Sequence, residues 1–507
     1  MRVVFLNTGV NALISILNIL LTFVTRTIFI SFLGEKFLGL NGLFSSLLSM
    51  LSLAELGIGT SIVYFLYKPL AINDKAMVSQ LMLLYKKIYS IIGGTVFLIG
   101  ISVIPFLPLI LGANMQLGNV TLYYFLFLLN SVGSYFFTYN RSLLIADQKG
   151  YIVTLNDFIF RVVLQIIQIV ILIYTGNFAY YLISQVITTI AGNITITKIA
   201  TKKYPYTKHT DRITSLETDF YSKFKKNIFG NFANKLGNVV VNGTDNIFLT
   251  VYVSLGAVGI YSNYVMIIGS VQSVLMSVSN SLTATIGNIA ALDKGNEGYV
   301  AFQRHQFMNS SLAYFTAVTM FVAINPFIHL WIGEKYLLSN GVVLLIIVNY
   351  YINRLRNTGN VFIDAYGLAW QQKYKPFVEA GLNIILSVVF LLVFKLGIVG
   401  VILSTLLTSL FFATIYEAYI VFAHGLKVPI RKYAMMYGNS LLMFLIALSA
   451  ITLITKWFDN NYSFRMTWLF LVFEMITTFL ISLLVYLLWN VKNKNFEFVV
   501  QRLKRGR

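Results

Sequence analysis

The sequence predicts an all-α polytopic membrane protein with about 14 transmembrane helices, arranged as two parallel six-helix lobes followed by two C-terminal helices. Three observations predict this class. Of the 507 residues, 57% are hydrophobic and only 11% are charged. Apolar runs of membrane-spanning length recur along the chain, and its first half resembles its second. Soluble domains carry roughly 25% charged residues, so the charge present cannot cover several soluble domains.

Fourteen apolar runs are long enough to cross a membrane. A helix needs about 20 mostly apolar residues to do so. The predicted spans are residues 5–33, 40–67, 80–110, 119–141, 152–175, 178–200, 226–253, 257–290, 306–332, 338–364, 376–394, 398–423, 434–455 and 465–490.

Lysine and arginine are unevenly distributed between the predicted loops. With the N-terminus inside, 28 of the 38 basic residues fall on the inner side, 5 on the outer side and 5 within spans. Because basic loops are retained in the cytoplasm, both termini are expected to be cytoplasmic. The net charge of +20 then reflects membrane topology, and no nucleic-acid partner is expected.

The chain repeats itself at a spacing of 221 or 222 residues. The matches are Leu33-Gly34 with Leu255-Gly256, Pro105–Gly112 with Pro326–Gly333, Asp157 with Glu379, and Gly176 with Gly397. Each unit holds six spans, so the two have the same orientation. Parallel repeats predict a pseudo-twofold axis along the membrane normal and a site shared between lobes. The alternative is a repeat that only builds a stable bundle.

The repeat and the charge pattern together predict five regions. These are an N-lobe at 1–200, a basic cytoplasmic linker at 201–223, a C-lobe at 224–424, the last two spans within 425–490, and a basic cytoplasmic tail at 491–507.

Polar side chains recur at helical spacing on one face of several spans. They are Asn7, Asn11, Asn18, Thr22 and Thr25 in the first span, Asn231, Asn238 and Asn242 in the seventh, and Asn349, Asn353 and Asn360 in the tenth. Because lipid-facing surfaces should be apolar, these stripes predict a bundle interior or a wet cavity. Hydrogen bonding between helices is the alternative, and it is favoured for the serines of the second and eighth spans.

Four basic residues accompany these stripes: Arg26, Lys235, Arg354 and Arg356. A charge facing lipid at mid-bilayer costs about 3 kcal/mol or more, so they are expected to face one another or water. Arginine binds phosphate oxygens bidentately and lysine binds them as a point charge. Together with Asn11, Asn18, Asn238, Asn242, Asn353 and Asn360, they are predicted to form a central site for an anionic, phosphate-bearing substrate.

The carboxylates within spans have other predicted roles. Glu55, Asp245 and Asp364 could balance the basic charge, or couple transport to H⁺ or Na⁺. Asp157 and Arg161 are four residues apart and are predicted to form a structural pair along one helix. Glu379 and Glu417 are expected to reach water at the cytoplasmic ends of their spans, whereas Glu474 is expected to be neutral or paired across the bundle.

Features of enzymes are missing from the sequence. It has no Gly-rich phosphate loop and no cysteine, and its four histidines lack metal-ligand spacing. No outer loop carries an acidic pair of the kind that a membrane glycosyltransferase uses. The sequence therefore predicts no enzyme activity, no catalytic residue, no cofactor and no metal.

Three segments resemble a known family: Phe32–Leu40 (FLGEKFLGL), Ser52–Gly59 (SLAELGIG) and Phe362–Gly367 (FIDAYG). With the two six-span lobes and two extra spans, the chain resembles the multidrug/oligosaccharidyl-lipid/polysaccharide (MOP) exporter superfamily. Within that superfamily it is similar to bacterial Wzx-type polysaccharide repeat-unit flippases over essentially its whole length.

The resemblance implies a function in cell-surface polysaccharide biosynthesis. Such a flippase moves an undecaprenyl-pyrophosphate-linked oligosaccharide from the inner to the outer leaflet of the bacterial cytoplasmic membrane by alternating access. Polymerase and glycosyltransferase partners are implied. Arg26 matches the position of a basic lumen residue in such flippases, and residues 434–490 match two spans that form a lipid-tail groove in the related lipid II flippase.

Two other functions remain as alternatives. A cation-coupled multidrug exporter of the same superfamily would share the fold, although four basic residues in the cavity disfavour a cationic substrate. A membrane polysaccharide polymerase or glycosyltransferase belongs to another class, and the short outer loops disfavour it.

Overall fold

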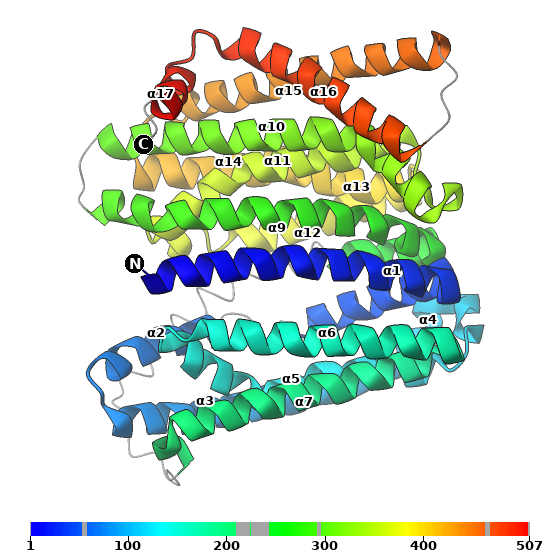
Figure 1. The fold of residues 1–507 in the computed structure, drawn as a ribbon, viewed down its shortest axis with the longest axis vertical. Helices are drawn as coiled ribbons and strands as arrows, with labels where there is room; N and C mark the ends of the chain where they lie inside the picture. Colours follow the sequence, from blue (N-terminus) through cyan, green and yellow to red (C-terminus); the bar gives the residue numbers. More distant parts are fainter. Residues whose placement is uncertain are drawn as a thin grey trace. The chain divides into compact units, whose positions relative to one another are not determined.

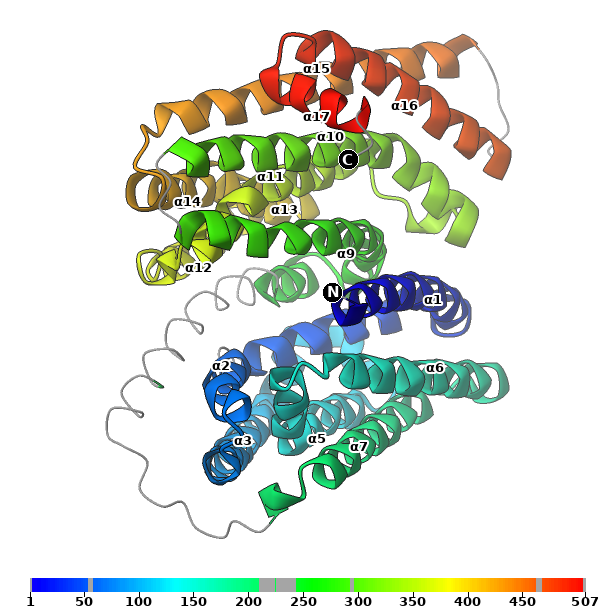
Figure 2. The same cartoon turned by 60° about the vertical axis from the view of Figure 1, so that its left-hand side comes forward.

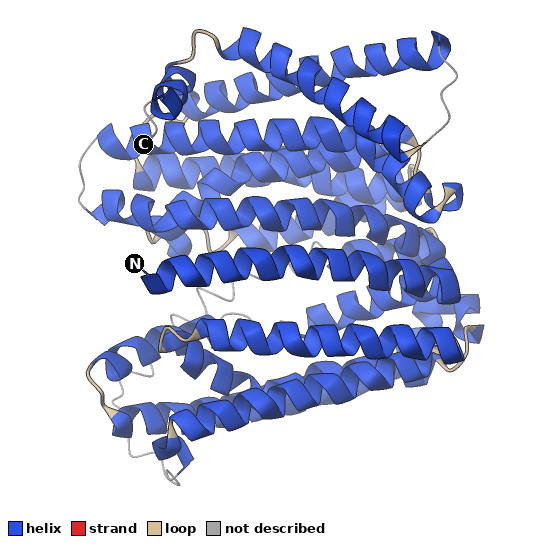
Figure 3. Cartoon of the chain, viewed as in Figure 1, coloured by secondary structure: helices blue, strands red, loops and turns tan. Residues whose placement is uncertain are grey.

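The computed structural model describes residues 2–52, 58–208, 224, 243–291, 296–461 and 467–504. Every regular element in these residues is a helix (Figure 3). Among them, eleven helices are long and apolar enough to cross a membrane, which confirms the predicted all-α polytopic class. The chain forms two compact units, Met1–Ser262 and Asn263–Arg507.

Unit 1 contains seven labelled α-helices and the first turns of an eighth. Their bounds are α1 Arg2–Leu51, α2 Ile58–Ala71, α3 Lys75–Val103, α4 Leu107–Leu111, α5 Val120–Ala146, α6 Gly150–Thr175, α7 Phe178–Lys203 and α9 Leu255–Ala291, which continues into unit 2. Helices α5, α6 and α7 pack against one another (Figure 2). Most of the predicted seventh span lies outside the described residues.

Helix α1 is two helical arms joined at Gly34. This glycine has φ 76° and ψ −175°, a conformation that is not helical. Residues with a Cβ rarely adopt positive φ, so glycine is the favoured residue at this position. The turn falls between the first two predicted spans, and the ribbon bends sharply there (Figure 1).

The turns of unit 1 gather at opposite ends of its helices. At one end Ser79 of α3 donates to the Tyr206 carbonyl at 3.1 Å, and the Tyr204 hydroxyl reaches Asp147 after α5 at 2.5 Å. At the other end the rings of Phe37 and Phe178 are 5.2 Å apart, close to that of Tyr123. This alternation matches the predicted assignment of loops to two sides.

Two glycines allow the second arm of α1 to approach α9 closely. A Cβ added at Gly39 would lie 2.0 Å from the Leu255 carbonyl oxygen, and one added at Gly259 would lie 2.2 Å from that of Glu35. Small residues are common where membrane helices meet, because they let the backbones touch.

Unit 2 is built from the remaining helices. They are the rest of α9, α10 Asn296–Ile332, α11 Asn340–Ala365, α12 Lys375–Leu392, α13 Ile398–Leu407, α14 Thr414–Tyr419, α15 Arg431–Asn461, α16 Trp468–Asn490 and α17 Lys494–Lys504. Two π-helical segments, Thr408–Ala413 and Ile420–Gly425, flank α14. Single π turns are rare and frequently mark functional sites.

Helix α11 corresponds to the tenth predicted span, yet it is absent from the eleven apolar helices. Part of its polar surface is covered by protein, because it packs against α10, α13 and α14. Both arginines of this helix, Arg354 and Arg356, are buried.

Two of the glycine pairs in the sequence repeat share a backbone feature. Gly112 and Gly333 both have positive φ, at 52° and 100°, and so do Gly176 and Gly397, at 57° and 56°. Gly176 and Gly333 follow α6 and α10, Gly397 precedes α13, and Gly112 follows the short helix α4, so the repeat includes positions where the chain must turn.

We expect Gly39→Ala to lower the melting temperature of the purified protein. The added methyl group would meet the Leu255 backbone, and overpacking of this kind costs typically 1–3 kcal/mol. Gly94→Ala in α3 is the matched control, because nothing lies within 4 Å of its Cβ position. Equal melting temperatures for Gly39→Ala and the native chain would contradict the close approach.

Candidate functional site

The most highly charged buried site in the described part of unit 2 centres on Arg356 of α11. Its side chain is 8% exposed. Nη2 and Nε donate to the two oxygens of Glu417 at 2.7 and 3.1 Å, a bidentate arrangement. Nη2 also donates to Glu379 of α12 at 3.2 Å, and Nη1 donates to the Asn353 oxygen at 3.0 Å. One guanidinium thus joins three helices.

Lys375 completes a network of four charges. Its Nζ lies 2.6 Å from Glu417 and 3.0 Å from Glu379. Two cations therefore face two carboxylates, and the formal charge of the network is zero. The side chain of Glu417 is only 2% exposed, so the expectation that it reaches water is wrong. Burying it is tolerable only because both oxygens are paired.

The π turn beside α14 helps to complete this network. Thr414 donates its hydroxyl to the Ser409 carbonyl five residues earlier at 2.7 Å. The Ser409 hydroxyl in turn accepts from Arg356 Nη1 at 3.2 Å. The π-helical segment ends four residues before Glu417, and the Ser409 hydroxyl and the Glu417 carboxylate both accept from the one guanidinium.

Unit 1 contains a related arrangement around Arg141 of α5. Nη1 donates to the Asp157 oxygens at 2.6 and 2.7 Å, and Nη2 donates to Asn193 of α7 at 3.0 Å. We expected Asp157 to pair with Arg161 along α6, and the structure corrects this. Arg161 is exposed, and Asp157 binds the arginine of the neighbouring helix instead.

Arg354 lies on a different face of α11 from Arg356. Two residues rotate a helix by about 200°, so one arginine faces α10 and the other faces α12 and α14. Arg354 is 1% exposed and donates to the Asn309 oxygen at 2.8 Å. His305 Nδ1 and the Thr358 hydroxyl are 3.0 Å apart beside it.

Arg26 is the predicted substrate-binding cation that stays partly exposed in unit 1. Its Nη2 donates to the hydroxyl of Ser262 on α9. Nearby in sequence, the Asn18 oxygen is buried and has no hydrogen-bond partner among the described residues. Asp245 is 7% exposed, and its neighbour Asn246 donates to the Ser46 hydroxyl at 2.8 Å.

Several predicted site residues cannot be placed. The residues Glu55, Lys235, Asn238 and Asn242 lie outside the described residues, and Asn11 is described only as part of α1. Of those that are placed in α11, Asn360 is partly exposed and Asp364 is exposed. The structure thus brings Asn353 and Arg356 together and separates them from Arg354.

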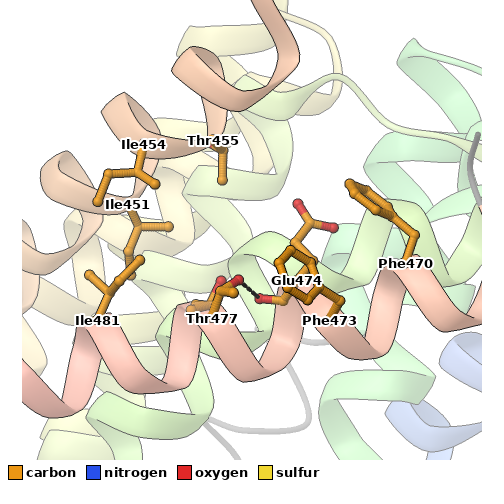
Figure 4. Close-up of a pocket in the computed structure, with 9 residues that line it drawn as sticks. Ile451, Ile454, Thr455, Phe470, Phe473, Glu474, Thr477 and Ile481 are labelled. Carbon is orange, nitrogen blue, oxygen red and sulfur yellow. Dashed lines mark hydrogen bonds between the residues drawn. The ribbon is translucent and has the colours of Figure 1, made fainter. Parts of the chain in front are cut away.

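Glu474 of α16 points into a small cleft against α15 (Figure 4). The cleft has a volume of about 30 Å³ and is lined mainly by apolar side chains, among them Ile451, Phe473 and Ile481. The carboxyl group of Glu474 is therefore surrounded by apolar side chains and by the threonines Thr455, Thr477 and Thr478.

A further charged cluster lies outside the spans, in the turn after α5. Asp147 accepts hydrogen bonds from Lys149 and from the Tyr204 hydroxyl. Burial alone would raise the pKa of Asp147, but these bonds and the charges of Lys149 and Lys203 lower it below its ordinary value. Burial and the bond to Asp147 raise the pKa of Tyr204.

Sequence reasoning missed four residues that contact or lie beside the predicted site residues or their carboxylate partners: Arg141, Lys375, His305 and Asn309. Arg141 and Lys375 stand at or next to the end of a predicted span, where a basic residue is expected to face the cytoplasm. A usable signal was present in α10, where His305 and Asn309 are four residues apart on one face within a mostly apolar helix.

Comparison with known proteins identifies the fold. No protein-family model and no curated protein matches the sequence. Among solved structures, the chain is similar to the lipid II flippase MurJ in an inward-closed conformation, with 14% identity, a TM-score of 0.66, and coverage of 95% of this chain and 98% of MurJ.

Multidrug transporters share the fold over less of the chain. An inward-facing MATE family transporter of the MOP superfamily has 13% identity and a TM-score of 0.60, covering 81% of this chain and 98% of its own. The MATE multidrug transporter DinF-BH has 14% identity and a TM-score of 0.57, covering 83% of this chain and 96% of its own. The predicted MOP exporter fold is confirmed.

Removing one member of the buried network should be strongly destabilising. We expect Glu417→Gln to cost about 3–5 kcal/mol, because Arg356 and Lys375 would then face one carboxylate. Adding Lys375→Met to that variant should recover part of the loss by restoring charge balance. Thermal unfolding of the purified variants measures both effects.

The matched control for this prediction is Glu334→Gln, which makes the same chemical change at an exposed residue. It should leave the melting temperature unchanged. A Glu417→Gln protein as stable as the native chain would show that the network contributes nothing to the stability of the fold.

The Asp147 cluster predicts a pH-dependent stability. A lowered folded-state pKa stabilises the fold above the unfolded pKa of about 3.9, and this contribution is lost as pH falls through the folded value. Asp147→Asn should therefore be less stable than the native chain at pH 7, by less than about 1 kcal/mol because the pair is partly exposed.

The difference in melting temperature between Asp147→Asn and the native chain should shrink as the pH falls below about 4 and vanish below the lowered folded-state pKa of Asp147. Lys149→Met removes a donor to the same carboxylate. Adding Asp147→Asn to that variant should therefore lower the melting temperature at pH 7 by less than it does in the native chain. A gap that persists unchanged at pH 3 would refute the assignment to Asp147.

Proposed function

We propose that the chain is a flippase that moves an undecaprenyl-pyrophosphate-linked oligosaccharide repeat unit from the inner to the outer leaflet. It would act by alternating access in the bacterial cytoplasmic membrane, with both termini cytoplasmic, in cell-surface polysaccharide biosynthesis. Its expected partners are the lipid-linked substrate, membrane lipid, and the polymerase and glycosyltransferases of the same pathway.

The observation that carries this proposal is how far each structural likeness extends. MurJ covers 95% of the chain and the MATE transporter 81%, although each is itself covered to 98%. The difference, 14% of 507 residues, is about 70 residues. The likeness to MurJ therefore includes a longer part of the chain than the likeness to the MATE transporter does.

Arg26 is the best-supported contact for the pyrophosphate. It is partly exposed, so its guanidinium can meet a ligand, and Ser262 orients it. Arg356 is fully engaged by two carboxylates. We therefore assign Arg356 to the framework of unit 2 and keep Lys235, from the sequence pattern, as the second proposed phosphate contact.

The alternatives are supported less well. A cationic drug would be repelled by Arg26 and Lys235 in the proposed site. An enzyme acting on the outer face would need an ordered loop there, and the described outer connection between α6 and α7 is only Gly176 and Asn177. Coupling to H⁺ or Na⁺ through Glu55, Asp245 or Asp364 is part of the proposal.

Arg26→Ala should reduce polymer export at least tenfold in a bacterium that depends on this chain, because one charge-assisted contact to pyrophosphate is lost. Lipid-linked repeat units should accumulate in the inner leaflet. Arg161→Ala is the matched control, since it removes an exposed basic side chain from α6.

Surface polymer, protein abundance in the membrane and the leaflet of the lipid-linked intermediate are the measurements. Normal export by Arg26→Ala at equal abundance would reject the phosphate site. Efflux of a cationic dye, with no effect of the chain on lipid-linked intermediates, would favour the drug exporter instead.

A further inference from the structure

A second cavity lies within unit 2, between α10, α15, α16 and the start of α17. Its volume is about 70 Å³, several times what one water molecule requires. Gln306 and Phe307 line it from α10, Asn439 from α15, Tyr486 from α16 and Asn495 from α17. None of these side chains takes part in the charged network around Arg356.

Gln306 is the informative residue of this cavity. It is 3% exposed, and neither its amide nitrogen nor its amide oxygen has a hydrogen-bond partner among the described residues. A buried polar group without a hydrogen-bond partner destabilises the fold. A side chain that leaves both a donor and an acceptor unmet at a cavity wall is suited to a ligand that supplies both.

The rest of the lining narrows the class of ligand. Among the residues that the structure describes, none that lines the cavity carries a charge, whereas amides and hydroxyls recur around it. The rings of Phe307 and Tyr486, whose centroids are 6.4 Å apart, provide an apolar surface. An anion would find no counter-charge there, but the hydroxyls of a neutral sugar can donate and accept, and the apolar face of its ring can pack on an aromatic side chain.

We propose that this cavity binds a neutral sugar residue. That the sugar belongs to the oligosaccharide of the transported lipid rests on the proposed function, because the predicted topology places this end of α10, α15 and α16 on the cytoplasmic side. The binding itself is a property of the cavity and does not depend on transport.

The start of α17 is held beside the cavity by its own contacts. Asn493 donates its side-chain amide to the Asn490 oxygen at 3.2 Å, and accepts from the Asn495 backbone at 2.9 Å. Arg304 of α10 lies 3.8 Å from the centre of the Phe498 ring. This wall is therefore ordered before any ligand arrives.

The test is binding of neutral monosaccharides to the full-length protein purified in detergent. The probes are glucose, galactose, mannose and N-acetylglucosamine, with inorganic phosphate as the anionic comparison. Trp489 is the optical reporter, because its indole nitrogen donates to Asn439 at 3.1 Å in the cavity wall. At least one sugar should give a saturable fluorescence change and raise the melting temperature.

Gln306→Leu should weaken that binding at least tenfold while leaving the ligand-free melting temperature equal or higher, since an unsatisfied amide is removed. Gln306→Met serves the same purpose if the leucine variant does not fold. Gln165→Leu is the matched control, because Gln165 is a buried glutamine of α6 whose amide oxygen also lacks a partner among the described residues. It should bind sugar normally.

The proposal is overturned if no sugar gives a signal that depends on Gln306, or if phosphate binds there in place of sugar. Sugar binding that depends on Gln306, in a chain that fails the export assay, would support this site and count against the proposed flippase alone.

Discussion

The packing of unit 2 depends on the bidentate pair between Arg356 and Glu417. Without Glu417, the guanidinium of α11 would be a buried cation facing only Glu379, and without Arg356 the carboxylate of α14 would be buried against Lys375 alone. Breaking a buried pair is costly because one charge stays behind, even where forming it gains little over apolar packing. The network therefore specifies how α11, α12 and α14 meet.

Both halves of the chain hold an arginine between side-chain oxygens of neighbouring helices, but at different positions in the sequence repeat. In each, an arginine from one helix is held by a carboxylate from the next helix and an oxygen from a third helix. Arg141, Asp157 and Asn193 do this in unit 1, and Arg356, Glu379 and Glu417 do it in unit 2. Asp157 and Glu379 match at the repeat spacing, but the arginines do not. Arg141 lies seven residues, or two helical turns, beyond Ser134, the position that matches Arg356.

This difference explains which parts of the site could be predicted. Helical periodicity finds a partner only on the same helix, so Asp157 was assigned to Arg161 instead of Arg141. It also treated Arg354 and Arg356 as members of one cavity, although two residues along a helix place side chains on nearly opposite faces. The four-charge network depends on the pairing of Arg356 with Glu417, 61 positions away, and the unsatisfied amide of Gln306 depends on what surrounds that side chain. A single sequence carries no signal for either.

The sequence by itself determined the class, the positions of most spans and the chain turns at glycine. It could do so because apolar length, loop charge and the freedom of glycine at positive φ are local properties. Only the tertiary structure decided which buried charges neutralise one another, that Arg26 stays partly exposed, and where a neutral cavity forms. Those outcomes depend on the distance between helices and on whether a buried polar atom finds a partner, and both are set by packing across the unit.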